Sequence, residues 1–221
     1  MAPSSLRAQI YTDLRKRLQR AEFGPGFRLV DTEIAAEYRT SRMPAREALM
    51  ALMSQGFLSQ TSRGFMVPEL TADDVREIFA VRKLLEPEAA GVAALKLDQA
   101  GLAALRVARD MARSAGEADD AEGLMEANIA FRGTWLAAVD NRRLVEIIES
   151  FRDHIQTVRI STLLRPDARK VVLDGIEALA AAFVEHHADA VRARMRAFMD
   201  AAEKEYFDAV NPVSDDVGQG W

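Results

Sequence analysis

The sequence contains no cysteine among its 221 residues, which excludes disulfides, thiolate nucleophiles and zinc–thiolate centres. It also has no apolar run that approaches the roughly 18 residues of a membrane-spanning helix. Its first residues lack the basic and then apolar pattern of a secretory signal. We therefore expect a cytoplasmic protein with no membrane partner.

Elements of catalytic chemistry are scarce as well. The chain has three histidines. We find no pairing of a nucleophile with a base, no glycine-rich phosphate loop and no cluster of metal ligands. The sequence therefore disfavours an enzyme. Turnover of a candidate ligand would be the observation that reverses this expectation.

Charge is distributed unevenly along the chain. The net charge is −5, but residues 1–68 hold ten Lys and Arg against six Asp and Glu. Residues 69–221 hold 19 Lys and Arg against 28 Asp and Glu. An N-terminal head (residues 1–68) with a net charge of +4 therefore precedes a body (residues 69–221) with a net charge of −9. A basic head on an acidic body predicts that only the head meets a polyanion, although chance segregation between two domains would give the same pattern.

The first 68 residues have the pattern of a winged helix-turn-helix. Apolar residues at helical spacing predict a helix over 4–20, which Gly24-Pro25-Gly26 breaks. A second helix is predicted from Asp31 or Thr32, and a third from a Ser41 cap to about Gln55. Two strand-like runs, 57–61 and 65–67, flank Ser62-Arg63-Gly64 and predict a hairpin.

The rest of the chain reads as helical throughout, so the fold class is mostly α. Six helices are expected to pack as an antiparallel bundle, because the loops between them are short. The first predicted helix begins near Thr71, and the second runs from Asp98 to about Ser114, followed by a loop over 116–120. The other four are predicted over 121–138, 141–158, 166–187 and 188–210. Residues 69–210 thus form a second domain, and 211–221 a flexible tail.

Donors for DNA lie at the start of the third helix and in the hairpin. Arg42 and Arg46 are four residues apart and share one helix face, as expected for a helix that enters the major groove. Ser41 and the first helical N–H groups suit a phosphate, and Arg63 beside Gly64 suits a minor groove or the backbone. Each arginine alone is more simply a solvated side chain, and the ordered set is the stronger signal.

These residues resemble the reading head of the GntR family, FadR subfamily. The run Ser41-Arg42-Met43-Pro44-Ala45-Arg46-Glu47-Ala48-Leu49 is the most specific segment. Supporting segments are Pro25-Gly26-Phe27-Arg28-Leu29, Ile34-Ala35-Ala36-Glu37-Tyr38, Gly56-Phe57-Leu58, Arg63-Gly64-Phe65 and, for the start of an FCD-type C-terminal domain, 70–74 and 78–90. The resemblance is dense to about residue 95 and thin afterwards.

The resemblance implies which residues face DNA. Ser41, Arg42, Pro44 and Arg46 correspond to the contacting positions, with Arg42 and Arg46 reading bases. Arg63 and Gly64 correspond to the wing contact, and Thr32 to a position that approaches phosphate. The family usually has threonine where this chain has Met43, a difference that bears on operator preference rather than on fold.

The C-terminal domain departs from the metal site that the resemblance implies. By resemblance the ligands are an Asp and a His on one helix and two later histidines, but this chain has Asn128, Arg132, Ile176 and Phe198 at those places. Arginine and phenylalanine offer no electron pair to a metal, so we expect no metal cofactor. The histidines lie elsewhere: His154 is expected in the core, and the pair at 186–187 at a helix end.

An organic acid is the effector that these replacements favour. The permanent charge and planar fork of Arg132 suit a carboxylate, with Arg82 and Asn128 as helpers. Ile176 and Phe198 would contact a hydrophobic part of the effector. The alternative is that Arg132 pairs with a buried carboxylate or points to solvent, and that the pocket is degenerate.

The resulting hypothesis is a homodimer that binds double-stranded palindromic operator DNA. A small-molecule effector in the C-terminal domain would bias the placement of the heads through the linker around 68–71. Repression is the family's usual outcome. The alternative is a non-sensing architectural DNA-binding protein.

Overall fold

The computed structural model describes residues 5–20, 22–151, 158, 162–163 and 165–210. The chain divides into two compact units. The first unit comprises the described residues within 1–85 and 140–164, and the second those within 86–139 and 165–221. Each unit is described by itself below.

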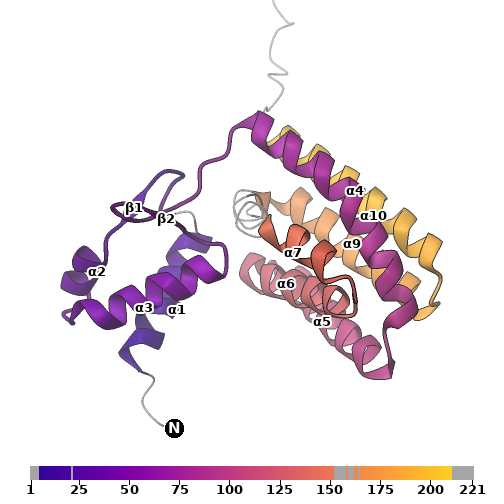
Figure 1. Cartoon of the computed structure of the whole chain (residues 1–221), viewed down its shortest axis with the longest axis horizontal. Helices are drawn as coiled ribbons and strands as arrows, with labels where there is room; N and C mark the ends of the chain where they lie inside the picture. The colour runs from indigo at the N-terminus through magenta and orange to yellow at the C-terminus, as the bar shows by residue number, and fades with distance from the viewer. Residues whose placement is uncertain (1–4, 21, 152–157, 159–161, 164, 211–221) are drawn as a thin grey trace, which may run out of the picture. The chain divides into compact units, whose positions relative to one another are not determined.

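Three helices form the core of the first unit's N-terminal part (Figure 1). They are α1 (Leu6–Gln19), α2 (Asp31–Glu37) and α3 (Arg42–Ser54). Helix α3 packs against both α1 and α2. Leucines and alanines at helical spacing on α3 are fully buried, which places its charged face outward. The three predicted helices are thereby confirmed to within a few residues.

A small sheet completes the winged helix-turn-helix. Strands β2 (Ser59–Thr61) and β3 (Gly64–Met66) form the predicted hairpin. A third strand, β1 (Arg28–Leu29), pairs antiparallel with β3 and gives the order β1-β3-β2. The sequence did not predict β1, because two residues carry no alternating pattern and the strand exists only through its partner.

Two of the predicted helix caps differ in the structure. Helix α2 begins at Asp31 itself, and the extended residue before it is Val30, so neither Asp31 nor Thr32 is the cap. Ser41 does occupy the N-cap position of α3, but its side chain accepts no capping hydrogen bond. Both carboxylate oxygens of Asp31 instead accept hydrogen bonds from Arg42 of α3.

Helix α4 (Ala72–Lys96) begins with a reciprocal cap. The Asp74 backbone N–H donates to the Thr71 hydroxyl at 3.1 Å, and the Thr71 N–H donates to the Asp74 carboxylate at 2.8 Å. The start predicted near Thr71 is thus confirmed.

Helix α7 (Arg142–Ser150) also begins where expected, because Asn141 accepts from the Leu144 N–H. It ends at Ser150, so the continuous helix predicted over 141–158 is wrong at this point. The Phe151 N–H bonds back to the last turn in a C-cap conformation. Ile155, which the prediction placed on this helix, lies outside the described residues.

The second unit consists of the C-terminal part of α4 with α5 (Gln99–Glu117), α6 (Ala121–Ala137), α9 (Pro166–Val184) and α10 (Ala188–Val210). Helix α5 packs on α6 and α9, and α9 packs on α10 (Figure 1). Trp135, Phe131, Ile176 and Phe183 are buried between them. No helix in the described part of the chain is long and apolar enough to cross a membrane.

Two predicted boundaries in this unit are wrong. Helix α5 continues to Glu117, so Gly116 is helical rather than in a loop. Packing of α5 on α6 and α9 outweighs the weak helix propensity of glycine. Helix α9 ends at Val184 rather than near 187, because His186 adopts a φ of 49° that a right-handed helix does not allow.

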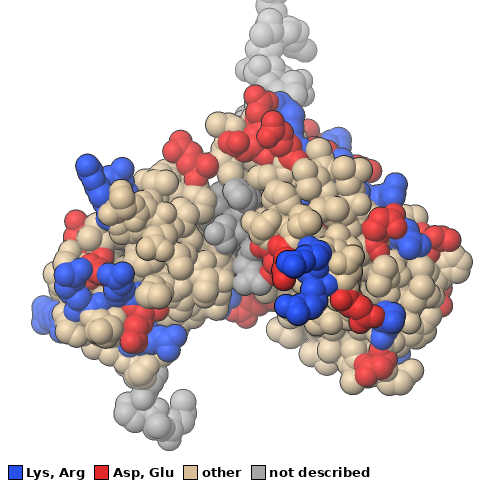
Figure 2. Space-filling view, in the orientation of Figure 1, with Lys and Arg blue, Asp and Glu red and all other residues tan. Residues whose placement is uncertain are grey.

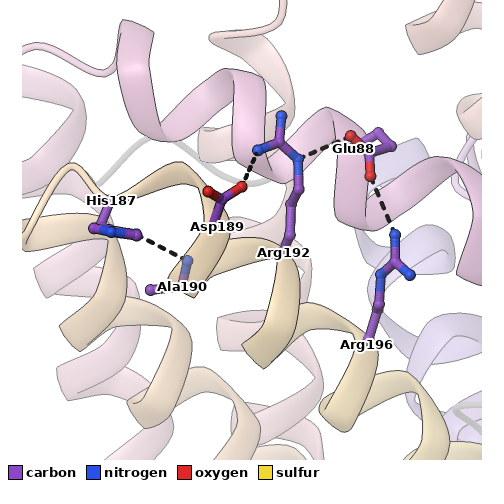
Figure 3. A network of polar contacts seen from close by, with 6 residues as sticks. All are labelled: Glu88, His187, Asp189, Ala190, Arg192 and Arg196. Carbon is purple, nitrogen blue, oxygen red and sulfur yellow. Dashed lines mark hydrogen bonds and ion pairs between the residues drawn. The ribbon is translucent and has the colours of Figure 1, made fainter.

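Ion pairs join α4 to α10 in the second unit (Figure 3). The Arg192 Nε donates to Glu88 Oε2 at 2.8 Å, and Arg196 reaches the other Glu88 oxygen at 3.2 Å. The side chain of Arg192 lies against the Cα of Gly91, where an added Cβ would come within 2.7 Å of its Nε. The side chain of Arg192 therefore occupies the space beside this glycine.

Candidate DNA-reading and sensor sites

The N-terminus of α3 presents two exposed arginines. The side chain of Arg42 is 65% exposed and that of Arg46 is 55% exposed. They share one face of the helix, while Ala45, Ala48 and Leu49 are buried on another. The predicted pairing of these arginines on one outward face is present in the structure.

One carboxylate lies beneath both arginines. Asp31 Oδ1 and Oδ2 each accept from Arg42 Nη2 at 3.1 Å, and Arg46 Nη1 is 3.7 Å from Oδ2. The Asp31 side chain is only 11% exposed. Sequence reasoning assigned Asp31 to a helix cap and missed this contact. The available signal was an acidic residue at the start of α2, next to the helix that carries the arginines.

The remaining predicted DNA residues surround this pair. Thr32 and Ser41 are exposed, and Pro44 is half-buried in the first turn of α3. Figure 2 shows lysine and arginine side chains gathered where Figure 1 labels α2 and α3, with acidic side chains among them. The structure thus gathers polar donors around the start of α3.

The wing carries the other two predicted residues. Arg63 is exposed at the turn between β2 and β3. Gly64 has a φ of +123°, and a Cβ there would lie 3.0 Å from the Leu29 carbonyl oxygen. Glycine is therefore required at this position, both by its backbone conformation and by the close approach of β1.

In the sensor domain, Arg132 lies next to an acid. Asn128 is buried one helical turn before it on α6. Arg132 Nη2 is 3.5 Å from Glu86 Oε1, with side-chain exposures of 12% and 1%. This is the buried pairing that the alternative hypothesis described. Arg82 is also buried, and its guanidinium lies 5.3 Å from the ring centroid of Phe79.

The two apolar replacements come from α9 and α10. Ile176 is fully buried, and Phe198 is half-buried with its ring against Gly175. A Cβ at Gly175 would lie 2.3 Å from the Phe198 ring, so the glycine makes room for it. A surface groove of about 550 Å³ lies along α5 and is lined by Val107, Met111 and Ala115 rather than by the predicted sensor residues.

Metal-ligating groups do not gather among the described residues, where no three His, Asp or Glu side chains form a potential site. His154 lies outside the described residues. His186 Nδ1 is 2.9 Å from the Ala94 carbonyl, and His187 Nδ1 accepts from the Ala190 N–H (Figure 3). His187 thus caps the start of α10. The prediction that both histidines lie at the end of a helix is corrected for His187, which lies at the start of the next one.

Comparison with known proteins decides the family. Residues 6–67 match the gntR family of bacterial regulatory proteins, and residues 77–201 match the FCD domain. The chain belongs to the GntR family. Its FCD domain agrees with the FadR subfamily, and its relatives are transcriptional regulators, not enzymes.

Two GntR-type relatives and one solved structure illustrate the likeness. The chain is 31% identical to the uncharacterized HTH-type transcriptional regulator YdhC of Bacillus subtilis, over 72% of this chain and 71% of YdhC. It is 33% identical to the HTH-type transcriptional regulator McbR of Escherichia coli, over 58% of each chain. The structure of E. coli McbR/YncC superposes with a TM-score of 0.73 at 26% identity, covering 95% of this chain and 100% of that one.

Proposed function

We propose that this GntR regulator is a homodimeric repressor that binds a palindromic operator. In it, Arg42 and Arg46 read bases in the major groove, and Arg63 with Gly64 contacts DNA from the wing. The observation that carries the proposal is the pair of exposed arginines at the N-terminus of α3, on a face adjacent to that of the buried alanines. Thr32 and Ser41 supply surrounding contacts to phosphates, and Pro44 faces the DNA beside them.

The test begins with a duplex that the wild-type protein enriches from a randomised pool. Arg46→Ala should weaken binding to this duplex by about 1–3 kcal/mol and relax the sequence preference. Arg63→Ala should weaken binding to all duplexes alike. Arg20→Ala is the charge-matched control, because it removes an exposed arginine at the end of α1. Equal discrimination by wild type and Arg46→Ala would remove Arg46 from the readout.

The sensor half of the proposal is an organic acid bound by Arg132, with Asn128 and Arg82 as polar helpers and Ile176 and Phe198 as the apolar side. The FCD domain and the burial of a permanent cation on α6 support it. A thermal-shift screen of carboxylic acids, paired with metal analysis of the purified protein, tests it. One acid should raise the melting temperature in wild type but not in Arg132→Ala, and bound metal should be absent.

A second candidate function has an observation of its own. Glu86 already supplies a buried carboxylate to Arg132, so an effector anion would have to share or displace it. This pairing favours an architectural DNA-binding protein with a degenerate pocket. If a small molecule changes the affinity for DNA in a saturable way, the protein is a sensor. If no molecule in the screen does so, the architectural protein is favoured.

A further inference from the structure

Asp31 joins two helices of the reading head through a single carboxylate. It is the first residue of α2, and its two oxygens both accept from Arg42 Nη2 of α3 at 3.1 Å. Arg46, one turn further along α3, approaches the same carboxylate at 3.7 Å.

The burial of the three groups is layered. The carboxylate is 11% exposed, while the two guanidiniums above it are 65% and 55% exposed. Arg42 engages Asp31 through one nitrogen, so most of its fork faces outward. The acid therefore holds the arginines from the protein side and leaves their outer edges to a ligand.

Two physical effects follow from this layering. Arginines four residues apart on a helix repel each other, and a carboxylate between them offsets the repulsion. An arginine side chain also loses rotamer freedom when it docks in one geometry, and a side chain already held by an ion pair loses less. Asp31 thus keeps two cations close together and ordered before DNA arrives.

We propose that Asp31 is a positioning residue for sequence readout, which rests on the proposed function of Arg42 and Arg46. It acts through the arginines and does not touch the bases. Its negative charge opposes attraction to any polyanion, so Asp31 lowers affinity for all DNA. In return it fixes the geometry that bidentate base recognition needs, and so raises the ratio of specific to non-specific affinity.

The test compares Asp31→Asn with Glu33→Gln. Both variants remove one negative charge from the first turn of α2, and Glu33 is exposed. An amide has one acceptor oxygen and adds N–H donors that face the guanidiniums. The probes are the duplex enriched from the randomised pool and a scrambled duplex of equal length and composition, each measured at several salt concentrations.

Asp31→Asn should bind the scrambled duplex more tightly than wild type, by two- to fivefold, and its specificity ratio should fall at least tenfold. Glu33→Gln should keep the ratio within twofold. An unchanged ratio in Asp31→Asn would overturn the proposal, and so would an increased ratio, which would make Asp31 a brake on DNA binding. Failure of the wild type to enrich any duplex would instead refute the proposed function itself.

A measurement on the wild type covers the case in which Asp31→Asn does not fold. Relaxation of the side-chain ¹⁵Nε signals, recorded without DNA, reports the order of each guanidinium on the picosecond to nanosecond timescale. Arg42 should be more ordered than Arg63, which is exposed at the wing. Equal mobility of the two side chains would show that Asp31 does not position Arg42.

Discussion

Arg132 and Glu86 form an ion pair inside the second unit, with 3.5 Å between Nη2 and Oε1. The side chain of the glutamate is 1% exposed and that of the arginine 12%. The guanidinium therefore sets a permanent positive charge beside a buried acid.

This pair predicts a large effect from removing one partner. Arg132→Met takes the cation away from a buried carboxylate and should cost about 3 kcal/mol in the free energy of unfolding. The double variant Arg132→Met/Glu86→Leu should cost less than the single one, because no charge then stays buried. Urea denaturation of the four proteins of this cycle measures both terms. Additive costs would show that the two side chains do not interact.

The wing is predicted to be sensitive to any side chain added at Gly64. Gly64→Ala places a Cβ 3.0 Å from the Leu29 carbonyl oxygen at a φ of +123°. It should destabilise the pairing of β1 with β3 by about 1–3 kcal/mol and weaken DNA binding. Gly24→Ala is the matched control, because a Cβ there meets nothing within 4 Å. Thermal unfolding and duplex binding test both, and equal effects from the two glycines would contradict this account.

Tyr38 predicts an alkaline transition in the reading head. Burial and the hydrogen bond that its hydroxyl donates to Asp13 raise its pKa to about 12. The pKa of Tyr38 in the folded protein exceeds the ordinary value of 10.0. The protonated hydroxyl therefore contributes fully to the free energy of unfolding below pH 10, and this contribution is lost as pH rises through about 12.

Ultraviolet titration of the phenolate measures this transition. Tyr38→Phe should remove the component with the highest midpoint, and Asp13→Asn should lower that midpoint. An unchanged curve above pH 11 in Tyr38→Phe would rule out the assignment.

Much of the fold follows from local patterns in the sequence. Leucine spacing locates α1, and the glycine at 64 locates the hairpin, because each signal lies within the element it specifies. What the sequence did not reveal depends on distant partners. Strand β1 requires β3, and Asp31 acquires its role only when α2 folds against α3. In the sensor, the sequence predicts a carboxylate effector for Arg132 and leaves a buried carboxylate of the chain as an alternative partner, and Glu86 is that partner in the structure.

The contact between Gly175 and Phe198 gives a last prediction for the sensor. A Cβ at Gly175 would lie 2.3 Å from the Phe198 ring, so Gly175→Ala must displace the ring or separate α9 from α10. Such overpacking should destabilise the second unit by about 1–3 kcal/mol. Gly133→Ala is the control, because its Cβ meets nothing within 4 Å on an exposed part of α6, and it should stabilise the helix by about 1 kcal/mol. Adding Phe198→Leu to Gly175→Ala should recover part of the lost stability in urea denaturation. If Phe198→Leu gives no recovery, the ring is not what the glycine accommodates, and the apolar side of the proposed effector site must be redrawn.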